Sequence, residues 1–224
     1  MLVDHWPLFG LRLRTPRLEL RLPSPDDLGR LADLAAEGVH QPHAMPFSVP
    51  WTDVAPAERA RSVLQHFWGR LAGWTPQVWE LSLTVFEDGQ VVGQQSLSAR
   101  AFAVLREVDT GSWLALRHHG RGIGTEMRTA ILHLAFAGLG ALEATSAAFV
   151  DNPASLRVSE KLGYEPDGLE RHARRGTAAT MRRLRLPRAR WQPRDDVTLT
   201  GLEPCLPLFG LQRPDLTPPE PRSL

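Results

Sequence analysis

The chain has 224 residues, which is enough for one large domain or for a domain with appendages, and its net charge of +1 favours neither nucleic acid nor another polyanion as a partner. Cys205 is the single cysteine, which excludes an intramolecular disulfide, and no Cys/His spacing predicts a metal site. We therefore expect the protein to reside in the reducing cytoplasm. Neither a signal peptide nor an apolar span of membrane length is evident, so we expect no membrane association.

The N-terminal part of the chain predicts one strand and two helices around an irregular segment. Residues 18–22 alternate like a half-buried strand, and Ser-Pro-Asp-Asp at residues 24–27 opens a helix. Prolines exclude a regular helix between residues 39 and 52, which we interpret as a pocket-lining loop. A second helix is expected over residues 56–72.

The rest of the chain predicts a hairpin and then alternating strands and helices. An Asp88-Gly89 turn joins strands at residues 78–86 and 90–99. After it we expect a strand at 108–117, a helix at 122–137, a strand at 142–150, a helix at 153–162, and strands near 168–173 and 180–186.

A glycine-rich turn lies between the strand at 108–117 and the next helix. Residues 117–125 read Arg-His-His-Gly-Arg-Gly-Ile-Gly-Thr, and glycines at alternate positions let the backbone approach a ligand. The N–H groups and the positive dipole end of the following helix favour an anion, so we predict a pyrophosphate site. A P-loop is excluded because its lysine is missing. A dinucleotide fingerprint fits poorly. Thr125 replaces its third glycine, and Glu143, the acid near the expected distance, starts a strand, whereas the ribose-binding acid belongs at a strand's end.

A second polar junction precedes the last predicted helix. Residues 152–164 read Asn-Pro-Ala-Ser-Leu-Arg-Val-Ser-Glu-Lys-Leu-Gly-Tyr, where Pro153 suits the first turn of a helix and Gly163 suits its end. Asn152 can bind a ligand or merely cap the helix, and Ser155 can face a ligand or bond the backbone. We favour ligand binding because the glycine-rich turn lies upstream.

Both motifs resemble those of the GNAT acyltransferases. Arg117, Gly120 and Gly122 are similar to the Arg-x-x-Gly-x-Gly loop that binds the pyrophosphate of coenzyme A in that family. Residues 152–164 resemble the Asn-x-x-Ser and Lys-x-Gly-Tyr signature of the branch that includes the RimJ/RimL-like ribosomal-protein N-terminal acetyltransferases. The chain also looks like actinobacterial members that use succinyl-CoA.

The resemblance implies an α/β (α+β) GNAT fold, with a mixed, mostly antiparallel central sheet, split between its fourth and fifth strands, and flanking helices. Those strands are residues 108–117 and 142–150. We expect a GNAT acyltransferase domain at residues 15–191, an N-terminal extension at 1–14, and a C-terminal extension with a Pro-rich tail at 192–224. Both extensions contain Pro-Leu-Phe-Gly-Leu, and the two copies either pack near each other or each cover part of a groove.

The resemblance also implies an activity, namely direct transfer of an acyl group from a coenzyme A thioester to a primary amine in one ternary complex. Acetyl-CoA is the default co-substrate. Succinyl-CoA is the alternative, and Arg100 and Arg106 are candidates for contacting its distal carboxylate. A protein N-terminus, a lysine and a small amine are all open as acceptors, and a homo-oligomer is open too.

The implied catalytic residues are Asp109, where the family has a glutamate, and Ser155, which would meet the departing thiolate. His40 and His43 are alternative bases, because imidazole titrates in the useful range. Backbone N–H groups of residues 114–116 are the implied donors to the developing oxyanion. The implied cofactor-binding residues are Leu114, Ala115, Leu116, Arg117, Gly120, Arg121, Gly122, Ile123, Gly124, Thr125, Asn152 and Ser155.

Two other classes of function stay open at the level of sequence. One is a catalytically silent regulatory module that binds coenzyme A, and it would be favoured if Asp109 and Ser155 both pointed away from the thioester. The other is a nucleotide-binding oxidoreductase, which would bind NADH but not acyl-CoA.

Overall fold

The structure, a computed structural model, describes residues 1–212 and is built on one nine-stranded sheet with the order β7-β8-β6-β5-β4-β3-β2-β1-β9. The strands are β1 (Arg12–Arg14), β2 (Leu18–Arg21), β3 (Val78–Glu87), β4 (Gln90–Arg100), β5 (Glu107–Leu114), β6 (Glu143–Phe149), β7 (Glu165–Arg174), β8 (Thr177–Pro187) and β9 (Thr198–Thr200). All neighbours are antiparallel except β5 and β6, which are parallel. The expected mixed, mostly antiparallel sheet is confirmed.

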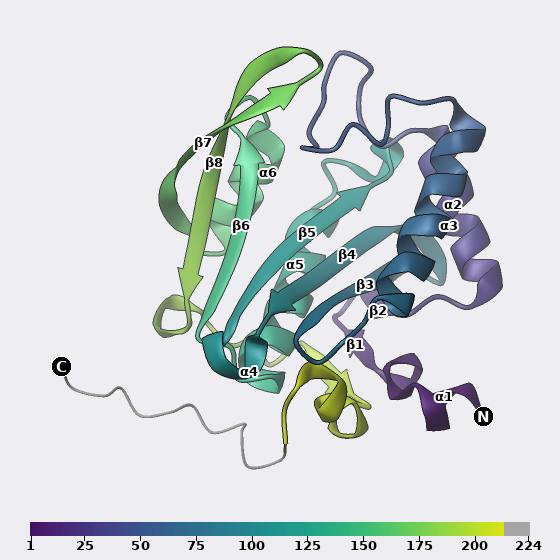
Figure 1. The fold of residues 1–224 in the computed structure, drawn as a ribbon, viewed down its shortest axis with the longest axis vertical. Coiled ribbons are helices and arrows are strands. Elements are labelled where there is room, and N and C mark those ends of the chain that lie inside the picture. The colour runs from purple at the N-terminus through teal and green to yellow at the C-terminus, as the bar shows by residue number, and fades with distance from the viewer. Residues whose placement is uncertain (213–224) are drawn as a thin grey trace.

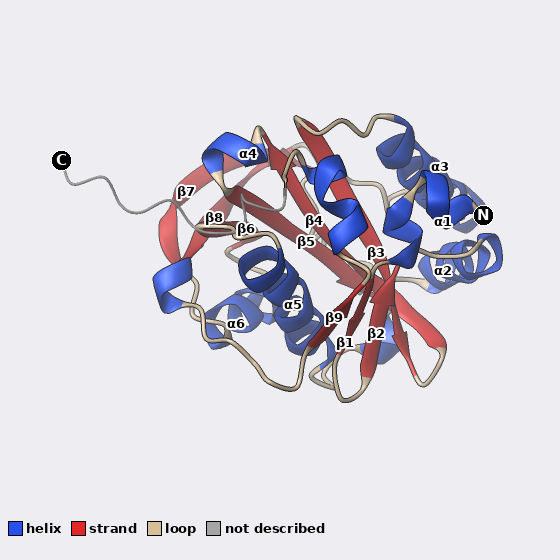
Figure 2. Ribbon diagram, turned by 90° about the horizontal axis from the view of Figure 1, so that it is seen from below, coloured by secondary structure: helices blue, strands red, loops and turns tan. Residues whose placement is uncertain are grey.

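Helices cover both faces of the sheet, with α5 and α6 on one face and α2 and α3 on the other (Figures 1 and 2). The helices are α1 (Leu2–His5), α2 (Pro25–Glu37), α3 (Pro56–Ala72), α4 (Phe102–Leu105), α5 (Ile123–His133) and α6 (Pro153–Lys161), with shorter segments η1 (Pro7–Gly10), η2 (Leu116–His118), η3 (Leu134–Gly138), η4 (Arg188–Arg190) and η5 (Glu203–Phe209). Among these elements, none combines the length and the apolarity that a helix needs to cross a bilayer.

The sheet splits between β5 and β6. These strands pair only at Glu107 with Glu143, Val108 with Ala144 and Asp109 with Thr145, and beyond that point they diverge (Figure 1). The rest of β5, up to Leu114, keeps its pairing with β4 on its other side. The predicted split between these two strands is therefore confirmed, and it leaves one edge of β5 free.

The first helix on the α2/α3 face is fixed firmly to the sheet. Ser24 and Asp27 form a capping box, and Arg21 of β2 donates a hydrogen bond of 2.8 Å to Asp27 Oδ2. Burial alone would raise the pKa of Asp27, but the hydrogen bonds from Ser24 and Arg21 outweigh it and lower that pKa. These contacts fix the start of α2 to the sheet. They thereby also position the end of α2, where the irregular segment starts.

Both terminal segments belong to the body of the fold. β9 pairs with β1 at the edge of the sheet, and η1 contacts η5, so the two Pro-Leu-Phe-Gly-Leu copies pack near each other. Phe209 lies 4.9 Å from Trp79 and 5.6 Å from Trp74 between ring centroids. The sequence did not predict β1 or β9, because three residues are too few to display an alternation. Residues 213–224 of the expected C-terminal extension lie outside the described residues.

Candidate functional site

A cleft of about 1200 Å³ occupies the split between β5 and β6. One wall, here called the helix side, is formed by most of the residues between 116 and 128 at the start of α5 and between 151 and 161 around the start of α6. The other wall, the loop side, consists of residues 39–51 and the tip of the β7–β8 hairpin, with residues 109–114 of β5 as its floor. The irregular segment is therefore a cleft-lining loop, as its prolines indicated.

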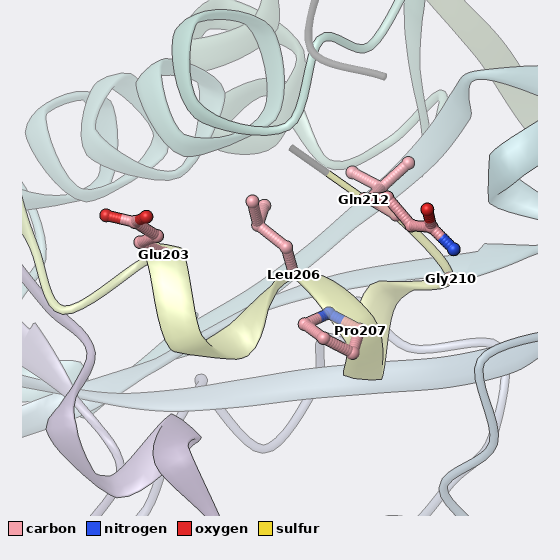
Figure 3. A pocket seen from close by; sticks show the side chains of 6 residues that line it. Glu203, Leu206, Pro207, Gly210 and Gln212 are labelled. Carbon is pink, nitrogen blue, oxygen red and sulfur yellow. The ribbon is translucent and has the colours of Figure 1, made fainter. Parts of the chain in front are cut away.

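A smaller hollow of about 580 Å³ lies at the C-terminal segment, lined by residues of η5 and its flanks (Figure 3). It contains none of the predicted site residues. Within residues 1–212, no cluster of His, Cys, Asp and Glu side chains could hold a metal ion.

The glycine-rich turn forms the part of the helix side that precedes α5. Gly120 and Gly122 have φ values of 76° and 82°, a conformation in which a side chain is strained. Gly122 is the N-cap of α5 and no side chain caps the first turn, while residues 122–125 line the cleft. Uncapped N–H groups and the positive end of the helix dipole thus face the cleft, which suits an anion.

The start of α6 lies on the same wall. Asn152 caps the helix, because its side-chain oxygen accepts a hydrogen bond of 3.2 Å from the Ser155 N–H. The capping interpretation is thus correct, yet it uses only the oxygen of the amide. Among the described residues, neither the Asn152 Nδ2 group nor the Ser155 hydroxyl has a hydrogen-bond partner, and both residues line the cleft.

The free edge of β5 presents backbone amides to the cleft. Ala115 N–H donates to Val92 O and Leu116 N–H donates to Gly38 O, each at 3.1 Å, so neither is available to a ligand. In an antiparallel pair, successive residues turn their N–H groups alternately toward and away from the partner strand. Because Ala115 points toward β4, Leu114 N–H points into the split. Of the three expected oxyanion donors, Leu114 is the one placed for that role.

The expected cofactor-binding residues divide into two groups. Leu114, Leu116, Gly120, Gly122, Ile123, Gly124, Thr125, Asn152 and Ser155 line the cleft, and Ala115, Arg117 and Arg121 do not. Arg117 is ion-paired with Glu37, and Arg121 with Glu87 at 2.8 Å, so these guanidinium groups hold the turn against its neighbours. Arg157 and Lys161 of α6 line the cleft in their place, which the sequence interpretation missed.

Asp109 lies on the floor of the cleft, where its Oδ2 accepts a hydrogen bond of 3.1 Å from Thr145. Water reaches the carboxylate through the open cleft, but protein surrounds it on its other sides, and this burial raises its pKa above the usual aspartate range. The Thr145 hydrogen bond and the charge of Arg128 oppose the rise. At about 3.3 Å per residue, about 16 Å of strand separates Asp109 from Leu114.

Arg128 is the prominent residue that sequence reasoning missed. Its side chain is only 4 % exposed, lines the cleft, and donates to Ser146 Oγ on β6 at 3.3 Å and to Ser112 Oγ on β5 at 3.2 Å. Its Nε has no partner, and it forms no ion pair with any residue of 1–212. The available signal was an arginine on the apolar side of α5, between Met127 and Ile131.

The alternative bases and the expected carboxylate partners have different outcomes. His40 is part of the loop's own structure, because its ring nitrogens contact Gln41 O at 2.8 Å and Thr52 Oγ1 at 2.7 Å. His43 is exposed at the cleft and stays an alternative base. Neither Arg100 nor Arg106 lines the cleft; Arg106 instead donates to Leu139 O and covers the Phe102 ring.

Comparison with known proteins places this geometry in a family. A family model described as an acetyltransferase (GNAT) domain matches residues 17–165. RimJ of Mycobacterium smegmatis, solved with a coenzyme A disulfide, is 20% identical over 81% of this chain and 88% of its own, with a TM-score of 0.65.

Two further solved structures have the same fold. RimL, a ribosomal-protein acetyltransferase solved with coenzyme A, is 17% identical over 77% of this chain and 95% of its own, with a TM-score of 0.59. A chimera of the spermidine N-acetyltransferase SpeG of Vibrio cholerae is 17% identical over 80% and 99%, with a TM-score of 0.60. Together with the family match, the split sheet and its glycine-rich turn establish that this chain belongs to the GNAT family of N-acyltransferases.

Proposed function

We propose that the protein transfers an acyl group from a coenzyme A thioester to a primary amine, by direct attack of the amine within one ternary complex. The observation that carries this proposal is the continuity of the cleft, which joins the anion-binding turn of α5, the free edge of β5 and the loop side. A thioester held from the helix side and an amine held on the loop side meet at that edge. Holding two reactants together in this way supplies much of the catalysis.

The helix side fits coenzyme A. The amides at the start of α5 would hold the pyrophosphate, and the free Nδ2 group of Asn152 would donate to the pantetheine arm. Arg157 and Lys161 offer charges for a further phosphate. The bound thioester supplies an activated acyl group.

Two groups of this chain are proposed to act on that thioester. Leu114 N–H would donate to its carbonyl oxygen, where negative charge develops as the amine attacks. The Ser155 hydroxyl would donate to the sulfur as it departs, and its lack of a partner among the described residues leaves it free to do so. That Asp109 and Ser155 both line the cleft supports an enzyme over a silent coenzyme A-binding module.

Asp109 is proposed to take the proton of the amine through water. Along β5 it lies about 16 Å from Leu114, too far for direct transfer or for transfer through one bridging water, so the proton would pass along a chain of several waters. Its raised pKa makes it a better proton acceptor than an ordinary aspartate once it is ionised. His43 is the second candidate for this role.

A thiol-release assay tests the proposed function. The protein is incubated with acetyl-CoA, propionyl-CoA or succinyl-CoA and with mixed amine and peptide acceptors. We expect free thiol and an acylated amine only when both substrates are present. Acyl-CoA binding without thiol release for any acceptor would support the silent module, and binding of NADH but not of acyl-CoA would support the oxidoreductase.

Arg128 favours a second candidate for the acyl group, a dicarboxylic one such as succinyl. A buried cation without an ion-pair partner is costly, and an arriving carboxylate would compensate it. Ser112, which Arg128 contacts, lies about 6.6 Å along β5 from Leu114. A succinyl chain spans about 4 Å from its thioester carbon to its carboxyl carbon, which brings its oxygens within reach of the guanidinium.

The Arg128→Met variant decides between the two acyl groups. We expect it to lower the ratio of kcat/KM for succinyl-CoA to that for acetyl-CoA by about tenfold, because a charge-assisted hydrogen bond is lost. Arg128→Lys keeps the charge and should keep part of the preference. The ratio cancels any general damage to the fold, so an unchanged ratio would leave acetyl-CoA as the co-substrate.

A further inference from the structure

The loop side of the cleft is lined by a chain of aromatic rings. Centroid distances are 5.9 Å from His40 to Phe47, 5.2 Å from Phe47 to Trp51 and 5.7 Å from Trp51 to Trp113. All four residues line the cleft, and the chain runs from the loop onto β5. Rings packed in this way present faces and edges to a further ring or apolar group.

The floor beside these rings is open. Asp109, Gly111 and Trp113 alternate along β5, so they face the same side of the sheet as the ring of Trp51. Gly111 adds no side chain there, and a Cβ at this position would lie 2.9 Å from Ser96 Oγ. The lining of the cleft nevertheless runs along the floor from Trp113 to Asp109.

Of the two carboxylates that line the cleft, Asp109 and Asp151, only Asp109 lacks an ion-pair partner among the described residues. Asp151, at the rim, binds Arg174 through two hydrogen bonds of 2.9 and 2.6 Å. Asp53, behind the loop, binds Arg175 in the same way at 2.7 and 2.6 Å. Asp109 also lines the cleft but forms no ion pair with another described residue. One negative charge complements one ammonium group, whereas a polyamine would require several.

We infer that the acceptor is an amine with a single positive charge and an aromatic or large apolar group beside that amine, and that Trp51 and Trp113 determine this specificity. The inference rests on the proposed function for its reaction. The two indoles would contact the apolar group of the acceptor next to the thioester, while Asp109, farther along the floor, would attract the ammonium as it enters the cleft. A small arylalkylamine and a peptide with an aromatic N-terminal residue share this chemistry.

Steady-state kinetics with matched acceptors test the inference. 2-Phenylethylamine is compared with ethylamine, the dipeptide Phe-Gly with Gly-Gly, and spermidine serves as the polycation. We expect kcat/KM to be at least about tenfold higher for the aromatic member of the preferred pair, from burial and ring contact. The pair with the larger ratio identifies the source, a free amine or a peptide terminus. Spermidine or ethylamine as the best acceptor would overturn the inference.

Substitutions then assign the preference to the two rings. Trp51→Ala and Trp113→Ala should each lower kcat/KM about tenfold more for the aromatic acceptor than for ethylamine. Trp68→Ala is the matched control, because Trp68 lies on α3 and is 56 % exposed. Should an alanine variant not fold, as circular dichroism would reveal, Trp51→Leu and Trp113→Leu keep the bulk without the ring. Equal losses for both acceptors would overturn the inference.

A binding measurement separates this inference from the proposed function. Calorimetry with coenzyme A present measures the affinity for 2-phenylethylamine and for ethylamine without any reaction. Selective binding of the aromatic amine without acyl transfer to any acceptor would mean that the proposed reaction is wrong and the binding specificity right. Transfer without aromatic preference in rate or affinity would mean that the proposed reaction is right and the inferred acceptor specificity wrong.

Discussion

The helix side and the loop side of the cleft are built in different ways. The helix side offers mainly the backbone amides at the start of α5, together with an asparagine whose side-chain oxygen caps α6. The loop side offers side chains, with rings in contact and two arginine–aspartate pairs that join the β7–β8 hairpin to its surroundings. Under the proposed function, this difference means that a common cofactor is recognised through backbone geometry and a particular acceptor through side-chain identity.

The largest effect should follow from damage to the helix side. Gly122→Val would force a β-branched residue into a φ of 82° and place a side chain at the mouth of the helix dipole. We expect acyl-CoA affinity, measured by calorimetry, to fall by about 100-fold or more. Gly89→Val is the matched control, since its φ of 76° imposes similar strain in the β3–β4 turn, away from the cleft. Unchanged affinity in folded Gly122→Val protein would remove the turn from the cofactor site.

A smaller effect is expected at the floor, where the two sides meet. Asp109→Asn should lower the rate about tenfold, and the loss should be largest just above the pKa of Asp109, where the wild-type carboxylate is ionised and the amine is still protonated. The loss should shrink toward alkaline pH. Because that pKa is raised, the acid limb of the wild-type profile should lie above pH 3.8. An equal loss across the pH range would indicate positioning instead of proton transfer.

The smallest effect should come from loosening the loop side. Arg175→Gln breaks the ion pair with Asp53. The side chains of Arg175 and Asp53 are each about one-third exposed. Exposed pairs contribute little, so we expect the KM of the acceptor to rise about threefold while the KM of acyl-CoA stays unchanged. High salt should raise the wild-type acceptor KM similarly. A rise in both KM values would contradict the independence of the two sides.

Sequence reasoning captured the helix side better because its constraints are local. The strand, the turn and α5 follow one another within residues 107–133. Local signals also predicted a helix outside this side, since the bounds of α3 agree with the expected helix at 56–72. The loop side depends on contacts between distant parts of the chain, such as Arg175 with Asp53 and Trp51 with Trp113. No spacing rule reveals such pairs.

The same limit explains the errors on the helix side. Arg117 fits the motif, but its partner Glu37 at the end of α2 removes its charge from the cleft. The buried position of Arg128 depends on hydroxyl groups of two diverging strands, Ser112 and Ser146. A motif specifies which residues are present. It does not show which of their side chains are bound by residues that are distant in the sequence.

The pairing of β9 with β1 bears on how a newly made chain reaches this state. Synthesis delivers the family-matching residues 17–165 first, while β1 still has an unpaired outer edge and Trp74 and Trp79 lack Phe209. An open strand edge is a template for pairing with other chains. In the folded protein, β9 at residues 198–200 covers this edge of β1 and removes it as a template for pairing with other chains.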